Sequence, residues 1–349
     1  MMLRVLIKLS ECKTGDILAQ DVFSKNGALV VPKNTPINAY IVSKLTHLGL
    51  DQILISPGSK SAEEAHNSSY RVFLAEYRKN LSVIKDIIGA LSVGHNLDVQ
   101  KTSSIVDSLY KETKEVSNII KCLNDIRNLN EYLYTHSLNV ALYSMLIAKW
   151  LGLPDNEVKD VMKAGLLHDI GKVKVPAHII NKEGKLTEEE FEEIKNHPMN
   201  GYLLIKGNPG ITDDILQGVL LHHEKYDGTG YPFKVNYKQV GTYPKIIAIA
   251  DVYDALNSDT VYRERITPFE AFKVLEKSGA GHFDLSMLKT FVQNIAYHYI
   301  GYEVVTNTGQ RGKVLNVVPH KSFSPIIWSD NKIVDLSSDS DVYTVDLIS

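Results

Sequence analysis

The chain has 349 residues, which is enough for two or three domains. Apolar residues make up 44% of it and charged residues 23%, so we expect ordinary buried cores and a water-soluble protein. The net charge of −3 does not indicate the basic surface that binds nucleic acid polymers. Two distant cysteines, Cys12 and Cys122, argue against a disulfide framework and fit a reducing compartment. Any metal would therefore be held by histidine and carboxylate side chains.

No segment predicts export or membrane insertion. The N-terminus from Met1 to Lys8 has too short an apolar core for a signal peptide. The most apolar later stretch, 140–153, is interrupted by Ser144 and Lys149 and is too short to span a bilayer. We expect a cytoplasmic protein that does not associate with a membrane.

Residues 1–58 are predicted to form a small α/β accessory module. Strands are expected at 28–32, after an Asn-Gly turn, and at 52–55. Between them, a helix is expected to begin near Thr35 and to end at Gly49. We find no catalytic cluster in this module.

Helices dominate the middle of the chain. The polar segment 59–109 is expected to be a helical connector. Apolar stripes along the helices of 59–128 predict packing against a neighbouring domain or against the second copy in a homodimer. Residues 110–300 are almost all helical, with capping boxes that begin helices at Thr187 and Thr267.

The last segment, 301–349, changes character and is predicted to form a small β module. The expected fold class is therefore mainly α, with a helical domain between a small α/β module and a small β module. Short strands separated by turns are expected at 302–305, 312–318, 326–328 and 342–345.

Five of the twelve histidines fall on inner faces or at the ends of helices in the helical region. Apolar residues follow His136 at helical spacing, so it points into a core. Alone, it would be read as a buried, hydrogen-bonded histidine. His197 precedes Pro198, and proline disfavours helix at the preceding residue, so His197 is expected in a kink. His222 and His223 close an apolar helix before a glycine-rich turn.

Two carboxylates face apolar surroundings in the same region. His168 and Asp169 end an apolar helix, and Asp169 shares a face with Val158. Asp251 shares a face with Ile247. A buried carboxylate is costly unless something neutralises it, and a metal would do so. For Asp251 the alternative is a buried lysine or arginine partner, but no cation lies nearby in the sequence.

The number of candidate ligands favours a pair of ions. Imidazole and carboxylate donors suit iron, manganese, zinc or nickel. Seven ligands are too many for one tetrahedral ion, so two metals bridged by Asp169 fit the count, and paired metals favour phosphate-ester hydrolysis. Lys172 would lie at the mouth of this site, although it could equally be a solvated lysine favoured by the helix dipole. The candidate ligands are His136, His168, Asp169, His197, His222, His223 and Asp251.

In this order, the residues resemble the motifs of the HD-GYP family, a branch of the HD-domain metal-dependent phosphohydrolases. The resemblance covers about residues 110–300 and implies an all-helical HD-GYP catalytic domain. Residues 1–58 and 301–349 look like accessory modules that accompany this domain. The matching motifs are Tyr134–Ser137, Leu167–Lys172, His197-Pro198 with Gly201, His222–Glu224 with Asp227-Gly228 and Gly230–Pro232, and Ala250-Asp251 with Asp254–Leu256.

The resemblance implies an enzyme of cyclic-dinucleotide signalling. Members of the HD-GYP family hydrolyse cyclic di-GMP to pGpG, in some cases on to GMP, by attack of a metal-bridged hydroxide on phosphorus. Some act instead on 3′,3′-cyclic GMP-AMP. The family also suggests two divalent ions, iron or manganese, and a diguanylate cyclase (GGDEF) protein as a partner.

The same resemblance implies a role for each site residue. Asp169 would bridge the two ions, and Lys172 would bind the scissile phosphate and help the leaving oxygen. Tyr231 and Gly230, from the Gly-Tyr-Pro turn, and Arg263 would contact the substrate. One ion would be held by His136, His168, Asp169 and Asp251, and the other by Asp169, His197, His222 and His223.

Two departures from the family pattern keep alternatives open. Tyr132 stands where some members carry the glutamate of a third metal, and Glu131 is one place off, so we predict a two-metal site. Thr260 replaces an arginine that would contact phosphate, and losing such a contact costs roughly 1.5–3 kcal/mol. The alternatives are a catalytically weak sensor or effector that binds metal or cyclic dinucleotide, and a phosphodiesterase that prefers 3′,3′-cyclic GMP-AMP. The Gly-Tyr-Pro turn argues against an HD phosphohydrolase for another nucleotide, and the complete ligand set with Lys172 favours the enzyme.

Overall fold

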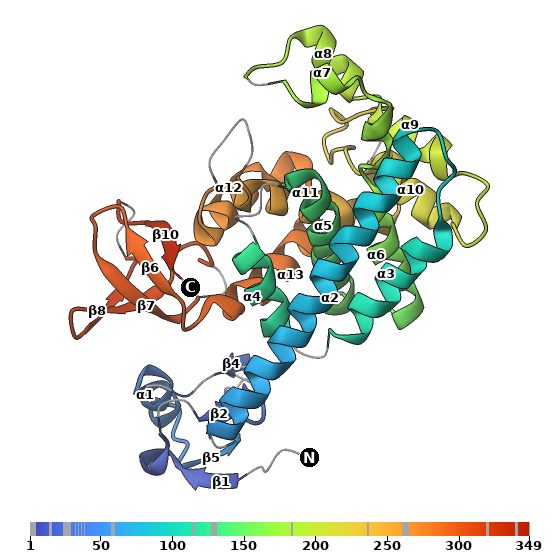
Figure 1. Ribbon diagram of the computed structural model, residues 1–349. Coiled ribbons are helices and arrows are strands. Elements are labelled where there is room, and N and C mark those ends of the chain that lie inside the picture. Colours follow the sequence, from blue (N-terminus) through green and yellow to red (C-terminus); the bar gives the residue numbers. More distant parts are fainter. Residues whose placement is uncertain are drawn as a thin grey trace. The chain divides into compact units, whose positions relative to one another are not determined.

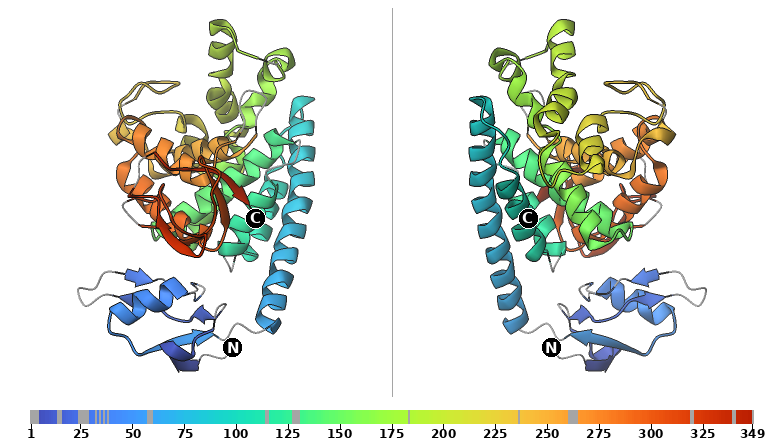
Figure 2. Two further views of the ribbon diagram at one scale, coloured as in Figure 1. Left: turned by 90° about the vertical axis from the view of Figure 1, so that its left-hand side faces the viewer. Right: turned by 90° about the vertical axis from the view of Figure 1, so that its right-hand side faces the viewer.

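The computed structural model of the chain divides into two compact units, Met1–Arg71 and Val72–Ser349. Figure 1 shows the labelled elements, and Figure 2 gives two further views. Helix α2 (Lys60–Ser92) carries the chain from the first unit into the second. The structure describes residues 5–13, 16–23, 29–31, 33, 35, 37, 39–56, 60–113, 116–126, 131–182, 184–235, 237–259, 265–318, 321–338 and 341–348.

The first unit is a small α/β fold. Its elements are β1 (Val5–Lys8), η1 (Leu9–Glu11), β2 (Ile17–Leu18), β3 (Val22–Phe23), β4 (Leu29–Val31), α1 (Ala39–His47) and β5 (Gln52–Ser56). Strand β5 lies between β1 and β2 in an antiparallel sheet, and β3 pairs with β4. Ile41 and Leu45 of α1 pack with strand residues such as Ile53 and Ile55 in one core.

Helix α1 begins later than the sequence suggests. Before it, Leu18 N–H donates to Thr35 O at 2.9 Å and Ile37 N–H donates to Asp16 O at 2.6 Å. These bonds hold the chain beside β2, so α1 starts at Ala39. The expected strands and the end of the helix agree with β4, β5 and α1.

The second unit is a helical domain built around α5. Helix α5 is buried on all sides from Thr135 to Ala148, and α6, α11 and α13 pack against it. Among the residues that the structure describes, no helix has both the length and the hydrophobicity needed to cross a bilayer. The elements are α3 (Val99–Lys111), α4 (Val116–Ile126), α5 (Tyr132–Trp150), α6 (Asp155–Leu167), η2 (Ile170–Lys174), α7 (Ala177–Ile180), α8 (Glu188–Ile194), α9 (His197–Ile205), α10 (Asp213–Leu221), η3 (Tyr237–Gln239), α11 (Thr242–Asn257), α12 (Pro268–His282), α13 (Leu285–Ala296) and η4 (Tyr297–Tyr299).

The chain closes in an antiparallel sheet with the strand order β10-β6-β7-β8-β9. Its strands are β6 (Glu303–Thr306), β7 (Arg311–Asn316), β8 (Ile326–Ser329), β9 (Lys332–Asp335) and β10 (Thr344–Ile348). Strand β10 contacts α12, where Oγ1 of Thr344 lies 3.1 Å from Oγ1 of Thr267. Strand β9 was not predicted, since its side chains are mostly exposed; it pairs with β8 across a turn in which Asp330 and Asn331 have positive φ. The predicted fold class is confirmed.

Candidate metal centre

Helix α5 presents His136 on a buried face near its N-terminus. The side chain is 3% exposed, and Nε2 lies 3.1 Å from Oδ1 of Asp251 on α11. The other ring nitrogen, Nδ1, donates to Oδ2 of Asp254 at 2.7 Å. Tyr132 stacks on the imidazole with ring centroids 5.1 Å apart, so an aromatic ring covers this side of His136. The inward direction predicted for His136 is confirmed.

Helix α6 ends at Leu167, and His168 and Asp169 follow it as the sequence predicts. His168 Nδ1 donates to the carbonyl oxygen of Gly165 at 2.8 Å. This bond turns Nε2 of His168 toward Oδ2 of Asp169 at 3.4 Å and Oδ1 of Asp251 at 3.9 Å. The ring is therefore oriented by the backbone of its own helix.

A close approach between η2 and α9 brings the next ligand to the same place. A Cβ atom on Gly171 would lie 2.0 Å from the carbonyl oxygen of His197 and 2.4 Å from the backbone nitrogen of Gly201. Only glycine fits at this position. The result is that Nε2 of His197 lies 3.2 Å from Oδ1 of Asp169.

His197 is the first residue of a new helix, directly after the break at Lys195-Asn196 that separates α8 from α9. Helix α8 ends at Ile194, Asn196 precedes α9, and Pro198 lies in the first turn. Proline suits that position because the first helical residues have no intrahelical partner for their N–H groups. His197 Nδ1 donates to Ile194 O at 2.8 Å, which leaves Nε2 facing the centre.

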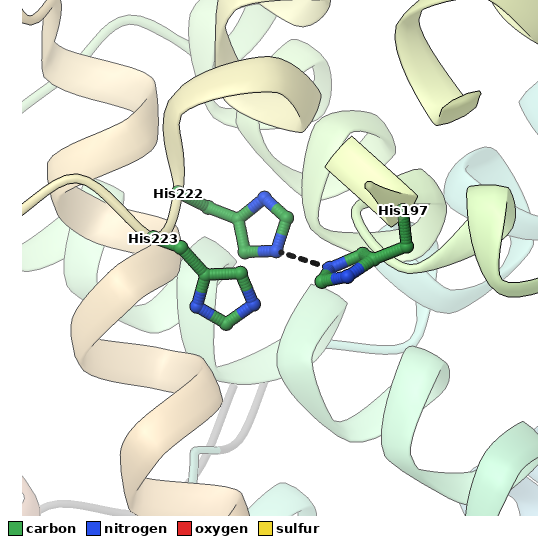
Figure 3. Close-up of side chains that lie close together, drawn as sticks. All are labelled: His197, His222 and His223. Atoms are coloured by element: carbon green, nitrogen blue, oxygen red, sulfur yellow. Dashed lines mark hydrogen bonds between the residues drawn. The ribbon is translucent and has the colours of Figure 1, made fainter. Parts of the chain in front are cut away.

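Two adjacent histidines at the end of α10 complete the cluster (Figure 3). His222 Nδ1 donates to Val219 O at 2.8 Å, and its Nε2 lies 3.3 Å from Nε2 of His197, the contact dashed in Figure 3. The ring of His223 has its centroid 5.0 Å from that of His197 and 4.1 Å from that of His222. Three imidazoles from two helices thus converge.

The structure brings all seven predicted ligands together, in groups within reach of a single ion. In each of three groups the ligand atoms lie within 4.8 Å of one another. The group that contains Asp169 shares His168 with one of the other groups and His222 with the remaining one. In the described part of the chain, His168 Nε2 and Asp169 Oδ1 are buried without a hydrogen-bond partner, as atoms that bind a metal would be. The groups are His136/His168/Asp251, His197/His222/His223 and His168/Asp169/His222.

The histidines of the second group are held neutral. Burial lowers the pKa of His197 to about 4 and that of His223 to about 3. Burial also lowers the pKa of His222 well below its ordinary value. Neutral imidazole is the form that binds a metal, so these rings are ready to act as ligands.

Charges act in the opposite direction on the two carboxylates and on His136. Burial alone would raise the pKa of Asp169 and of Asp251, but Lys172 lowers the former and His136 the latter, so both are ionised. Burial alone would lower the pKa of His136, but hydrogen bonds to Asp251 and Asp254 raise it to about 10. His136 is therefore protonated in the metal-free protein, and an ion bound at Nε2 would take the place of that proton. The two carboxylates and the neutral imidazoles are donors that suit divalent cations.

The predicted substrate contacts are described only in part. Lys172 is half-buried on η2, and its Nζ donates to Oδ2 of Asp169 at 2.5 Å. Burial would lower the pKa of Lys172, but the carboxylate of Asp169 raises it, so the ammonium stays protonated. Two positions lie outside the described residues: Arg263, a predicted substrate contact, and Thr260, which stands where the family has an arginine.

The Gly-Tyr-Pro turn folds back over the end of α10. Tyr231 N–H donates to His223 O at 3.2 Å, and the two rings stack with centroids 4.5 Å apart. A Cβ on Gly230 would lie 2.5 Å from Cα of Glu224, so Gly230 allows this close packing. The buried carboxylate of Glu224 accepts hydrogen bonds of 2.7 to 3.2 Å from the backbone N–H groups of 233–235. The turn is thereby fixed beside His223.

Sequence reasoning gave no role to Asp254, although it lies in one of the matching motifs, and it missed Asn139. Asp254 is 2% exposed and accepts from His136 Nδ1 and, at 2.9 Å, from Asn139 Nδ2. A carboxylate one turn from Asp251 on an apolar helix was a usable signal, because burial requires a partner. Asn139 gave no comparable signal, since an amide in a helix is commonly solvated.

Comparisons with known proteins agree with this geometry. Residues 117–287 match the family model of the HD domain. A cyclic di-GMP phosphodiesterase of Pseudomonas aeruginosa is 35% identical over 223 residues, which are 64% of this chain and 54% of that protein. A 3′3′-cGAMP-specific phosphodiesterase of Vibrio cholerae is 38% identical over 148 residues, which are 42% of this chain and 32% of that protein.

The fold also has a solved counterpart. An HDG"Y"P protein from Bdellovibrio bacteriovorus matches with a TM-score of 0.50 and 16% identity, covering 82% of this chain and 98% of that one. At this identity the likeness concerns the fold. The chain spans about half the length, or less, of the two curated relatives described above.

Proposed function

Because this chain belongs to the HD-domain family and is of the HD-GYP type, we propose that it is a metal-dependent phosphodiesterase for a cyclic dinucleotide. One observation carries the proposal. Two groups of candidate ligands are joined by a third, which contains Asp169, and the protonated Lys172 lies directly beside that carboxylate. This arrangement combines cation binding with a positive charge for a phosphate.

The centre would hold two divalent ions, iron or manganese. Imidazole and carboxylate donors suit these ions. When bound, paired ions supply a nucleophile at neutral pH and stabilise the attacking and leaving oxygens of a displacement at phosphorus. Asp169 would bridge the two ions. One ion would be held by His136, His168, Asp169 and Asp251, and the other by Asp169, His197, His222 and His223.

The protein's own groups would bind and orient the phosphodiester. Lys172 would bind a non-bridging oxygen of the scissile phosphate and give its proton to the leaving oxygen. One face of the Tyr231 ring is stacked on His223. Tyr231 would therefore offer the edge of its ring and its hydroxyl to the nucleotide. Gly230 would let the turn approach the substrate closely. Arg263 would add a second positive charge.

Cyclic di-GMP is the substrate we propose first, with pGpG as the product and GMP after a second cleavage. The support is the longer match to the Pseudomonas aeruginosa phosphodiesterase. The alternative, 3′,3′-cyclic GMP-AMP, is supported by the shorter but slightly more identical match to the Vibrio cholerae enzyme. Thr260 in place of an arginine favours a change in nucleotide preference or weaker binding.

The test is to purify the protein anaerobically, measure metal per chain, and follow both cyclic dinucleotides by chromatography with Fe(II) or Mn(II). We expect about two metals per chain and conversion of cyclic di-GMP. Clear metal loading without turnover of either nucleotide would reject the enzyme and favour a sensor. Turnover of cyclic GMP-AMP alone would reassign the substrate.

The setting of the enzyme is also a proposal. Cys12 and Cys122 are unpaired, which fits the reducing cytoplasm. A homodimer and a diguanylate cyclase partner stay predictions of the sequence and the family resemblance. Light scattering during size-exclusion chromatography would test the dimer directly.

A further inference from the structure

A line of hydrogen bonds leads from α2 to the metal centre. The hydroxyl of Tyr77 donates to Oδ1 of Asn139 at 2.7 Å, and Nδ2 of Asn139 donates to Oδ1 of Asp254 at 2.9 Å. Oδ2 of Asp254 accepts from Nδ1 of His136 at 2.7 Å, and Nε2 of His136 lies 3.1 Å from Asp251. Four side chains therefore connect a helix outside the ligand set to a predicted metal ligand.

In each hydrogen bond of this line, only one assignment of donor and acceptor is possible. A carboxylate can only accept, so Asp254 needs donors from both Asn139 and His136. The amide of Asn139 presents its NH₂ group to Asp254 only while its oxygen faces the other way, and that oxygen is where the Tyr77 hydroxyl donates. Loss of the hydroxyl would leave a buried oxygen unpaired and remove the reason for the amide to keep this orientation.

Burial and neighbouring hydrogen bonds hold Tyr77 in the position from which it donates to Asn139. Its side chain is 0% exposed, and its hydroxyl also lies 3.4 Å from the carbonyl oxygen of Thr135, the residue before His136. One turn along α2, Asn80 donates to Ser108 on α3 at 2.8 Å, which fixes the helix laterally. Burial raises the pKa of Tyr77 well above its ordinary value, so the hydroxyl keeps its proton. Tyr77 also lies outside the 117–287 region that matches the HD family model.

We propose that Tyr77 is a positioning residue for the metal centre: through Asn139 and Asp254 it holds the His136 ring in the orientation that binds a metal. The inference rests on the proposed metal centre but not on turnover. Partners that orient a metal ligand directly are commonly worth 10–100-fold in metal affinity. Three hydrogen bonds separate Tyr77 from His136, so its effect should be smaller.

The test is Tyr77→Phe in the full chain, which removes only the hydroxyl. We expect Mn(II) affinity, measured by electron paramagnetic resonance titration, to fall roughly threefold to tenfold. The imidazole nitrogen resonances of His136 in the metal-free protein should shift as well. The matched control is Tyr299→Phe, which removes a buried hydroxyl 2.9 Å from that of Tyr253. It should leave both readouts unchanged.

A double-mutant cycle identifies the route. If Tyr77 acts through Asp254, then Tyr77→Phe should change Mn(II) affinity less than twofold in an Asp254→Asn background. Equal effects in both backgrounds would overturn the inference, as would an unchanged affinity in Tyr77→Phe alone. If the wild-type chain binds neither Mn(II) nor Fe(II), both this inference and the metal centre fall. If it binds Mn(II) normally but turns over no nucleotide, the proposed enzyme alone falls.

Discussion

The Nδ1 atom of His136 lies 2.7 Å from Oδ2 of Asp254, while Nε2 of the same ring lies 3.1 Å from Oδ1 of Asp251. Both carboxylates come from α11, one turn apart, so a single helix contacts both nitrogens of one imidazole. Asp254 accepts the proton of Nδ1 and so holds the ring, and Asp251 stands beside Nε2, the nitrogen that would bind the metal. This division of roles is typical of metal sites, where a second carboxylate orients the ligand.

Asp254→Asn should lower Mn(II) affinity about 10–100-fold. An amide has one acceptor oxygen where a carboxylate has two, so His136 and Asn139 would compete for it. The measurement is a metal titration, with Asp155→Asn as the control, because Asp155 is an exposed carboxylate that accepts from Tyr110 at 2.6 Å. Equal affinities in the two variants would contradict the orienting role.

Asp169→Ala should remove both metals and all activity, since Asp169 belongs to the group that joins the other two. Metal per chain after dialysis is the measurement, by elemental analysis. The same substitution at Asp213, which is exposed in the first turn of α10, should leave the metal content unchanged. Two metals per chain in Asp169→Ala would exclude a bridging role.

Lys172→Ala should keep both metals and slow turnover about 100-fold or more, because it removes both a phosphate-binding charge and a proton donor. Lys174→Ala is the matched control, since Lys174 is exposed two residues further along η2. Turnover at saturating cyclic di-GMP and metal content are measured together. Unchanged turnover in Lys172→Ala would remove this residue from the mechanism.

Gly171→Ala should destabilise the fold, because its Cβ would lie 2.0 Å from the carbonyl oxygen of His197. Overpacking of this kind costs about 1–3 kcal/mol of the free energy of unfolding. Metal affinity should fall as well, since η2 would be pushed away from α9. Gly89→Ala is the control: nothing lies within 4 Å of its Cβ position in α2, so it should stabilise by roughly 0.5–1 kcal/mol. Equal stabilities in denaturant unfolding would refute the close approach.

The sequence predicted the helical elements that carry the site with good accuracy. Apolar periodicity correctly gave the inward direction of His136, and the capping box at Thr187 is present with both of its hydrogen bonds. The errors lie at boundaries: α1 starts at Ala39, after hydrogen bonds that hold Thr35 and Ile37 beside β2, and α9 begins at His197, with Pro198 in its first turn. Local helix propensity does not predict hydrogen bonds to partners that are distant in the sequence.

The missed residues share one physical property. Their importance comes from partners that lie far away in the sequence. Asp254 contacts His136 across 118 positions and Asn139 across 115 positions. Tyr77 contacts Asn139 from 62 positions away. Periodicity reports which face of a helix is buried, but it does not say which side chain on another helix meets that face.

The sequence by itself determined the chemical types of the ligands, their order along the chain and the positions of Gly171 and Gly230. These follow from local rules, since apolar spacing, helix ends and glycine are all visible in a short window. Only the tertiary structure decided how the ligands group, and that Nδ1 of each of His136, His168, His197 and His222 is tied down so that Nε2 faces inward. That outcome depends on how α5, α6, α9, α10 and α11 pack against one another, because distances of a few ångströms between helices are set by packing and not by spacing along the chain.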